Sequence, residues 1–123
     1  MATVAKLSRT AESPVAGEKE PDIVTHPLLI DTETLQQQLG QSGVVIIDVR
    51  GKAAYEFGGH IPGAVHSTWH EYSDPNAVAK GLLNPDLGEI ERILQRLGVN
   101  QDSEVVIYSN PFDNWGDEGR MFW

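Results

Sequence analysis

Two oppositely charged residues, Asp48 and Arg50, lie at the end of the apolar run 44–47. An arginine at the end of a strand could bind an anion, so Arg50 is a candidate substrate-binding residue. A structural interpretation competes with this one: Asp48 accepts backbone N–H groups, and Arg50 pairs with Glu56 to fix the following turn. We favour the structural interpretation, because structural ion pairs often resemble functional sites.

Three histidines are further candidates for chemistry. His60 lies in a Gly-His-Ile-Pro-Gly stretch, and His66 and His70 are four residues apart, with Glu71 next in the sequence. On a helix this spacing could bind zinc, but the residues around His66 have the pattern of a strand. We therefore predict no metal site and no other cofactor. His60 is expected to contact the backbone of a turn rather than to act as an acid or a base.

The chain of 123 residues contains no cysteine. This excludes disulfides, thiolate metal sites and any reaction whose nucleophile is a cysteine of this chain. Ser109, which follows the apolar run 105–108, carries a hydroxyl group. A serine nucleophile requires an adjacent base, however, and no such arrangement is visible in the sequence. No catalytic residue is predicted.

Acidic residues outnumber basic ones by 18 to 9, which gives a formal net charge of −9 and a pI near 4.7. Proteins that bind nucleic acid or an anionic membrane surface rely on Lys and Arg, so we expect neither kind of partner. No apolar run reaches the roughly 18 residues that span a bilayer, and no secretory signal is evident. These observations predict a cytoplasmic protein with a single core.

Helices and strands are predicted to alternate along the chain. Apolar residues at helical spacing, bounded by capping residues, indicate the helices. These cover residues 32–39, 52–58 and 85–97 and begin again at Asp117. Short apolar runs rich in β-branched residues indicate the strands. These cover residues 28–30, 44–49, 64–66 and 104–108. The alternation predicts an α/β fold with an open parallel sheet flanked by helices.

The carboxyl ends of parallel strands are where functional loops lie in such folds. Two loops meet this condition, one after Arg50 and one from Ser109 onward. Residues 1–24 show no apolar periodicity, and we expect them to form a disordered leader to a domain at 25–123.

Three motifs resemble those of a rhodanese domain. They are Val45-Ile46-Ile47-Asp48-Val49-Arg50, Tyr55-Glu56 and Gly59-His60-Ile61-Pro62-Gly63-Ala64-Val65. The resemblance covers about residues 27–123 and implies the rhodanese-like fold. It also implies a set of structural motif residues, namely Asp48, Arg50, Glu56, His60, Pro62 and Gly63. The segment from Asn114 to Trp123 is most similar to the first, non-catalytic half of two-domain thiosulfate or mercaptopyruvate sulfurtransferases.

The resemblance also implies where the chemistry of the family takes place. Members carry sulfane sulfur on a cysteine just after the strand that matches residues 104–108, and here that position is Ser109. A serine hydroxyl without an activating base cannot carry a persulfide. Asp113, Asp117 and Glu118 follow in the sequence and oppose an anion. The resemblance therefore implies the fold without activity for this chain alone.

In the proteins that the resemblance indicates, a second rhodanese domain of the same chain supplies the cysteine and takes a small-molecule sulfur donor. We therefore expect this domain to form one wall of the active cleft. Phe112 and Trp115 are the candidate interface residues. The last helix has no cap after Trp123, so we expect a C-terminally incomplete, truncated domain with Trp123 in its core.

Two other functions remain open. The first is a stand-alone, inactive rhodanese module that binds a protein partner. The second is a relative of the cysteine phosphatases, and the lack of cysteine argues against it as strongly as it argues against sulfur transfer. The reading frame beyond Trp123 would distinguish the first from a domain of a longer sulfurtransferase.

Overall fold

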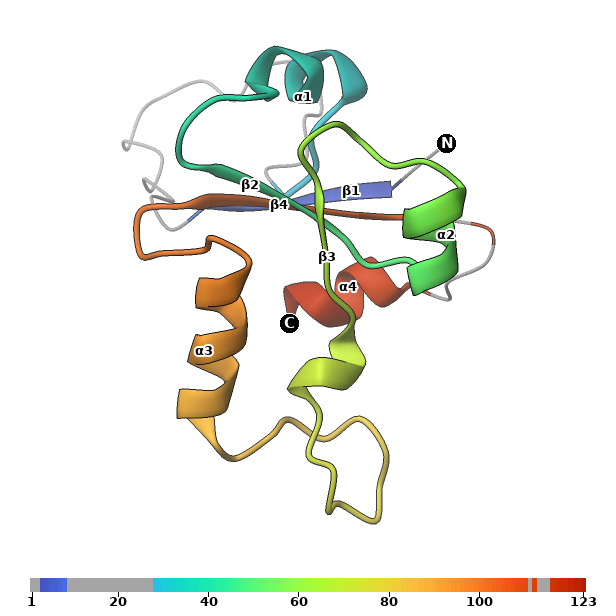
Figure 1. Cartoon of the computed structure of the whole chain (residues 1–123), viewed down its shortest axis with the longest axis vertical. Helices are drawn as coiled ribbons and strands as arrows, with labels where there is room; N and C mark the ends of the chain where they lie inside the picture. Colours follow the sequence, from blue (N-terminus) through green and yellow to red (C-terminus); the bar gives the residue numbers. More distant parts are fainter. Residues whose placement is uncertain (1–2, 9–27, 111, 113–115) are drawn as a thin grey trace, which may run out of the picture.

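A four-stranded sheet in the order β1-β4-β2-β3 forms the centre of the molecule (Figure 1). The structure, a computed structural model, describes residues 3–8, 28–110, 112 and 116–123. Its elements are β1 (Thr3–Ser8), α1 (Thr32–Gln38), β2 (Val44–Asp48), α2 (Lys52–Phe57), β3 (Val65–His66), the 3₁₀ helix η1 (Trp69–Tyr72), α3 (Leu87–Arg96), β4 (Glu104–Ser109) and α4 (Asp117–Phe122). Strand β2 pairs in parallel with both β3 and β4, which confirms the predicted parallel α/β sheet.

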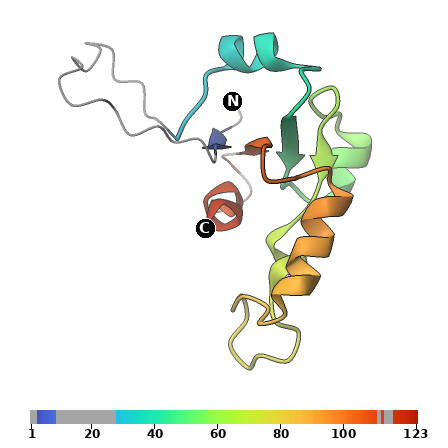
Figure 2. The ribbon, with the colours of Figure 1, turned by 90° about the vertical axis from the view of Figure 1, so that its left-hand side faces the viewer.

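Helices cover both faces of this sheet, with α1 on one face and α3 and α4 on the other (Figure 2). Leu35 of α1 packs with Ile46 and Val106 in one core cluster. On the opposite face, Met121 of α4 packs against the cluster that contains Ile47. Neighbouring residues of a strand point to opposite faces, so β2 is apolar throughout because each face needs its own apolar side chains.

Local capping and turn signals place several elements where the sequence predicts them. The carboxylate of Asp31 accepts a hydrogen bond from the backbone N–H of Thr34 at 2.7 Å and begins α1. The turn before β3 closes through a bond from Ala64 N to Ile61 O at 3.0 Å. Gly63 has a φ of 79° in this turn, a value that a residue with a Cβ rarely adopts.

Residues 3–8 depart from the expected disordered leader. They form β1, which pairs antiparallel with β4 along its full length, from Thr3 opposite Ser109 to Ser8 opposite Glu104. An exposed strand edge offers backbone N–H and C=O groups that an extended segment can bind without any apolar pattern. The leader composition therefore gave no sign of this strand. Positions 9–24 of the expected leader lie outside the described residues.

Two further expectations are wrong. Residues 28–30 form no strand, although Leu29 makes an isolated bridge. Trp123 is fully exposed rather than in the core. Met121 and Phe122 pack on the sheet, and Trp123 lies just beyond the end of α4, so it does not share their burial.

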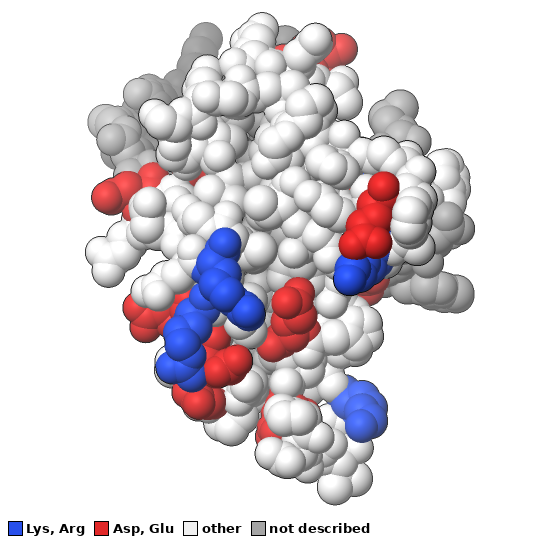
Figure 3. Space-filling view, in the orientation of Figure 1, with Lys and Arg blue, Asp and Glu red and all other residues white. Residues whose placement is uncertain are grey.

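Charged side chains of both signs lie together on the molecular surface. Over α3, basic side chains are interspersed with acidic ones (Figure 3), and Arg92 pairs there with Glu89 at 2.8 Å. In the part of the chain that the structure describes, no helix is long and apolar enough to cross a membrane.

Candidate functional site

The three parallel strands end side by side. Asp48, the last residue of β2, is in register with Tyr108 of β4 and with His66 of β3. The two loops predicted to carry function, after Arg50 and after Ser109, therefore begin at the same edge of the sheet. The residues at this edge are the candidate site.

The carboxylate of Asp48 is the centre of this edge. Its side chain is fully buried. Arg50 donates to it from Nε at 3.0 Å and 3.1 Å, from Nη2 at 2.7 Å and from its backbone N–H at 2.9 Å. The hydroxyl of Tyr108 donates to Asp48 Oδ2 at 2.7 Å. Both carboxylate oxygens are thus satisfied, as a buried charge requires.

Arg50 is committed to structural contacts. Besides Asp48, its Nη2 donates to the carbonyl oxygen of Gly59 at 2.6 Å, which ties the strand end to the turn after α2. Its side chain is only 19% exposed. The expected ion pair with Glu56 is wrong, because Asp48 lies two residues away on the same strand end and takes the guanidinium first. Glu56 instead lies 3.6 Å from Lys52, one helical turn away.

The charges of this network stabilise each other. Burial opposes ionisation of Asp48, but hydrogen bonds from Arg50 and Tyr108 outweigh it, and the pKa of Asp48 is below its usual value. Burial and the hydrogen bond to Asp48 raise the pKa of Tyr108 to about 12. The hydrogen bond with Asp48 also raises the pKa of Arg50. At neutral pH the site therefore contains a carboxylate, a guanidinium and a neutral phenol.

The turn at residues 59–64 is attached to this network by two tyrosines. Tyr108 accepts a hydrogen bond from Ile61 N at 3.1 Å, and Tyr55 donates to Ala64 O at 2.8 Å. His60 Nδ1 lies 2.9 Å from Ile61 O, and its ring stacks on Tyr55 with centroids 4.1 Å apart. His60 thus contacts the backbone of the turn that Pro62 and Gly63 form.

The other two candidate histidines lie in different environments. His66 Nε2 lies 2.7 Å from the backbone oxygen of Arg50. His70, in η1, stacks on Trp69 with ring centroids 3.7 Å apart. Across the described ranges, no group of three or more His, Asp or Glu side chains is arranged to hold a metal ion.

The residues after β4 are only partly described. Ser109 ends the strand with a fully buried side chain. Phe112 is 83% exposed. Asp117 accepts a hydrogen bond from the indole Nε1 of Trp69 at 3.1 Å. Asp113 and Trp115 lie outside the described residues.

Sequence reasoning missed the part that Tyr108 plays. It was assigned only to the buried strand, although a tyrosine at the end of an otherwise aliphatic run carries a hydroxyl that burial obliges to find a partner. Taken together, the strand-end groups neutralise one another. Their arrangement holds two loops in place and offers no activated nucleophile among the described residues.

Comparison with known proteins gives the family. Residues 31–120 match the model of the Rhodanese-like domain. This chain belongs to the rhodanese-like domain family. The match confirms the resemblance of the strand-end motifs, and the network around Asp48 is how those motifs are used in this rhodanese-like domain.

Several curated relatives are similar to this chain. The sulfur carrier protein TtuD of Thermus thermophilus is 30% identical over 100 residues, which cover 80% of this chain and 33% of TtuD. A putative thiosulfate sulfurtransferase of Saccharopolyspora erythraea is 32% identical over 72% of this chain and 30% of its own. The thiosulfate sulfurtransferase of Pseudomonas aeruginosa is 28% identical over 83% of this chain and 38% of its own. This chain spans about a third of the length of these relatives. No solved structure matches it significantly.

Proposed function

We propose that this rhodanese-like domain is a non-catalytic part of a thiosulfate or 3-mercaptopyruvate sulfurtransferase and supplies one wall of its active cleft. One observation carries the proposal: the chain contains no cysteine in 123 residues. Transfer of sulfane sulfur proceeds through a thiolate that accepts the sulfur and then releases it to a thiophile. A domain without that thiolate has to take another part in the reaction.

The burial of Ser109 supports the same proposal. The resemblance to the family places the sulfur-carrying cysteine at this position. The Ser109 side chain is fully buried at the end of β4, so its hydroxyl does not face solvent from which a donor would arrive. A hydroxyl group is also a much weaker nucleophile than a thiolate at neutral pH.

A rigid strand edge suits a cleft wall. The contacts of Asp48 with Arg50 and Tyr108 fix the loop beginnings relative to the sheet. In this proposal a second rhodanese domain of the parent chain supplies the cysteine and binds the small-molecule sulfur donor. Phe112, which is largely exposed, and Trp115 would contact that domain. The threefold greater length of the relatives leaves room for it. We also propose a cytoplasmic location, which fits a chain without disulfides.

Thiocyanate formation tests the proposal. The chain is incubated with cyanide and either thiosulfate or 3-mercaptopyruvate, with a cysteine-bearing sulfurtransferase as positive control. We expect the chain and its Ser109→Ala variant to give the same signal as a blank. Turnover above the blank that Ser109→Ala abolishes would show that this domain is itself catalytic.

A stand-alone, inactive module that binds a protein partner is the second candidate. The exposure of Phe112 favours it, because a large aromatic side chain at a loop is typical of interfaces. The reading frame beyond Trp123 distinguishes the two functions. A second rhodanese domain with a cysteine supports the cleft wall, and a stop codon after one more strand supports the binding module.

A further inference from the structure

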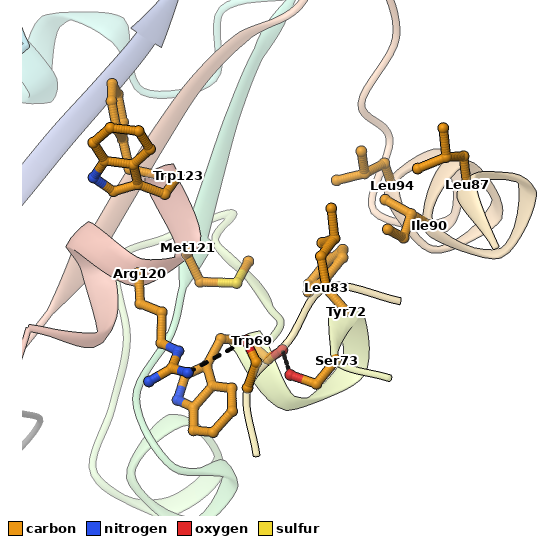
Figure 4. Close-up of a pocket in the computed structure, with 12 residues that line it drawn as sticks. Trp69, Tyr72, Ser73, Leu83, Leu87, Ile90, Leu94, Arg120, Met121 and Trp123 are labelled. Atoms are coloured by element: carbon orange, nitrogen blue, oxygen red, sulfur yellow. Dashed lines mark hydrogen bonds between the residues drawn. The ribbon is translucent and has the colours of Figure 1, made fainter. Parts of the chain in front are cut away.

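An apolar cavity of about 530 Å³ lies between α3, η1 and α4. Leu87, Ile90 and Leu94 of α3 line one side, and Met121 of α4 lies across from them (Figure 4). None of the residues that bind Asp48 lines this cavity. Its volume is in the range of about 300–1,000 Å³ that is typical of sites for small organic molecules.

Arg120 is the only charged residue in the cavity lining. Its guanidinium lies over the ring of Trp69, with Cζ 4.0 Å from the ring centroid. Its Nη2 donates a long hydrogen bond, 3.4 Å, to Gly81 O. The ion pairs found among the described residues do not include Arg120. A cation without a carboxylate partner is notable in a chain with twice as many acids as bases.

The position of this guanidinium is fixed by its neighbours. Trp69 is itself held by the hydrogen bond from its Nε1 to Asp117 Oδ1 and by the stacked ring of His70. Asp117 is the nearest acid that the structure ties to this group, and it binds the indole rather than Arg120. Gly81 has a φ of 88°, and a Cβ there would collide with Arg120 Nη2. Only glycine admits this close approach.

We propose that this cavity binds a small amphipathic organic anion. The apolar body of the ligand would lie among Leu87, Ile90 and Met121, and its carboxylate or sulfonate group would pair with Arg120. Apolar walls with one fixed polar anchor are the usual composition of a small-molecule site, and a guanidinium binds such acid groups with two parallel hydrogen bonds. The inference is independent of the proposed function at the strand ends.

Calorimetric titration with two matched probes tests this site. The probes are 2-naphthalenesulfonate and its neutral analogue 2-naphthalenemethanol. We expect the chain to bind the sulfonate at one saturable site, at least tenfold more tightly than the alcohol. Arg120→Gln should reduce the sulfonate affinity to that of the alcohol and leave the alcohol affinity unchanged. Arg92→Gln, which changes an exposed arginine of α3 outside the cavity, should alter neither.

Two more variants keep the test decisive if Arg120→Gln unfolds the chain. Arg120→Lys keeps the charge and should retain a preference for the sulfonate. Ile90→Trp fills the cavity without changing the charge and should weaken both probes at least tenfold.

Three results would overturn the proposal. The first is no saturable binding, and the second is equal affinity for the two probes. The third is a dimer in analytical ultracentrifugation whose formation excludes the sulfonate, which would assign this face to a second copy of the chain.

Discussion

The hydroxyl of Tyr108 donates a hydrogen bond of 2.7 Å to Asp48 Oδ2 across two neighbouring parallel strands. The same hydroxyl accepts the backbone N–H of Ile61, so one phenol joins β4, β2 and the turn before β3. Neither bond is available to phenylalanine. The contact is therefore the simplest place to measure what holds the strand edge together.

Tyr108→Phe should lower the free energy of unfolding by about 1–3 kcal/mol, because it leaves a buried carboxylate oxygen and a backbone N–H with one partner fewer. Urea unfolding monitored by circular dichroism measures the change. Tyr55→Phe is the matched control, since it removes a single bond to Ala64 O and should cost less. Equal losses in the two variants would contradict a special role for Tyr108.

The raised pKa of Tyr108 predicts a loss of stability at alkaline pH. The folded state holds this proton up to about pH 12, whereas an unfolded tyrosine loses it near pH 10. The stabilisation is therefore complete below about pH 10 and is lost as the pH rises toward 12. The difference in unfolding free energy between the wild type and Tyr108→Phe should shrink over this interval. A constant difference would argue against the elevated pKa.

The lowered pKa of Asp48 predicts the opposite limb. Its contribution is present above the unfolded pKa of about 3.9 and is lost as the pH falls through the lower folded value. Asp48→Asn should destabilise the chain by about 3 kcal/mol at pH 7, because it leaves the largely buried Arg50 guanidinium without its carboxylate. The gap to the wild type should narrow below about pH 4. Chemical unfolding at a series of acid pH values measures this narrowing.

The burial of Ser109 predicts that a thiol placed there is inert. Ser109→Cys should react slowly with a thiol reagent in the folded chain and rapidly in urea, because the reagent reaches only an exposed thiolate. Val78→Cys is the control, since Val78 is fully exposed and a thiol there should react at once. Fast labelling of Ser109→Cys, or thiocyanate turnover by it, would place Ser109 at an open site.

Local signals allowed most of the fold to be predicted from the sequence. The cap at Asp31, the turn at Pro62 and Gly63, and the apolar runs of β2 and β4 each depend on residues close together in the chain. Strand β1 could not be predicted in this way, because its pairing with β4 uses backbone groups and needs no pattern of side chains.

The candidate site was harder to predict, because its contacts join distant residues. Asp48 and Tyr108 are 60 residues apart and meet only through the register of β2 and β4. The partner of Arg50 was also ambiguous in the sequence, since Asp48 and Glu56 both offered a carboxylate. Geometry decided between them, because the side chain of Asp48 lies on the same strand end.

Intact-mass measurement tests the central claim most directly, namely that this rhodanese-like domain carries no sulfur cargo. The chain is incubated with thiosulfate or 3-mercaptopyruvate, freed of the donor and weighed by mass spectrometry, with a cysteine-bearing sulfurtransferase treated in parallel. We predict that the mass of this chain is unchanged, while the control gains one sulfur atom. A gain of one sulfur atom by this chain, removed again by cyanide, would contradict the account.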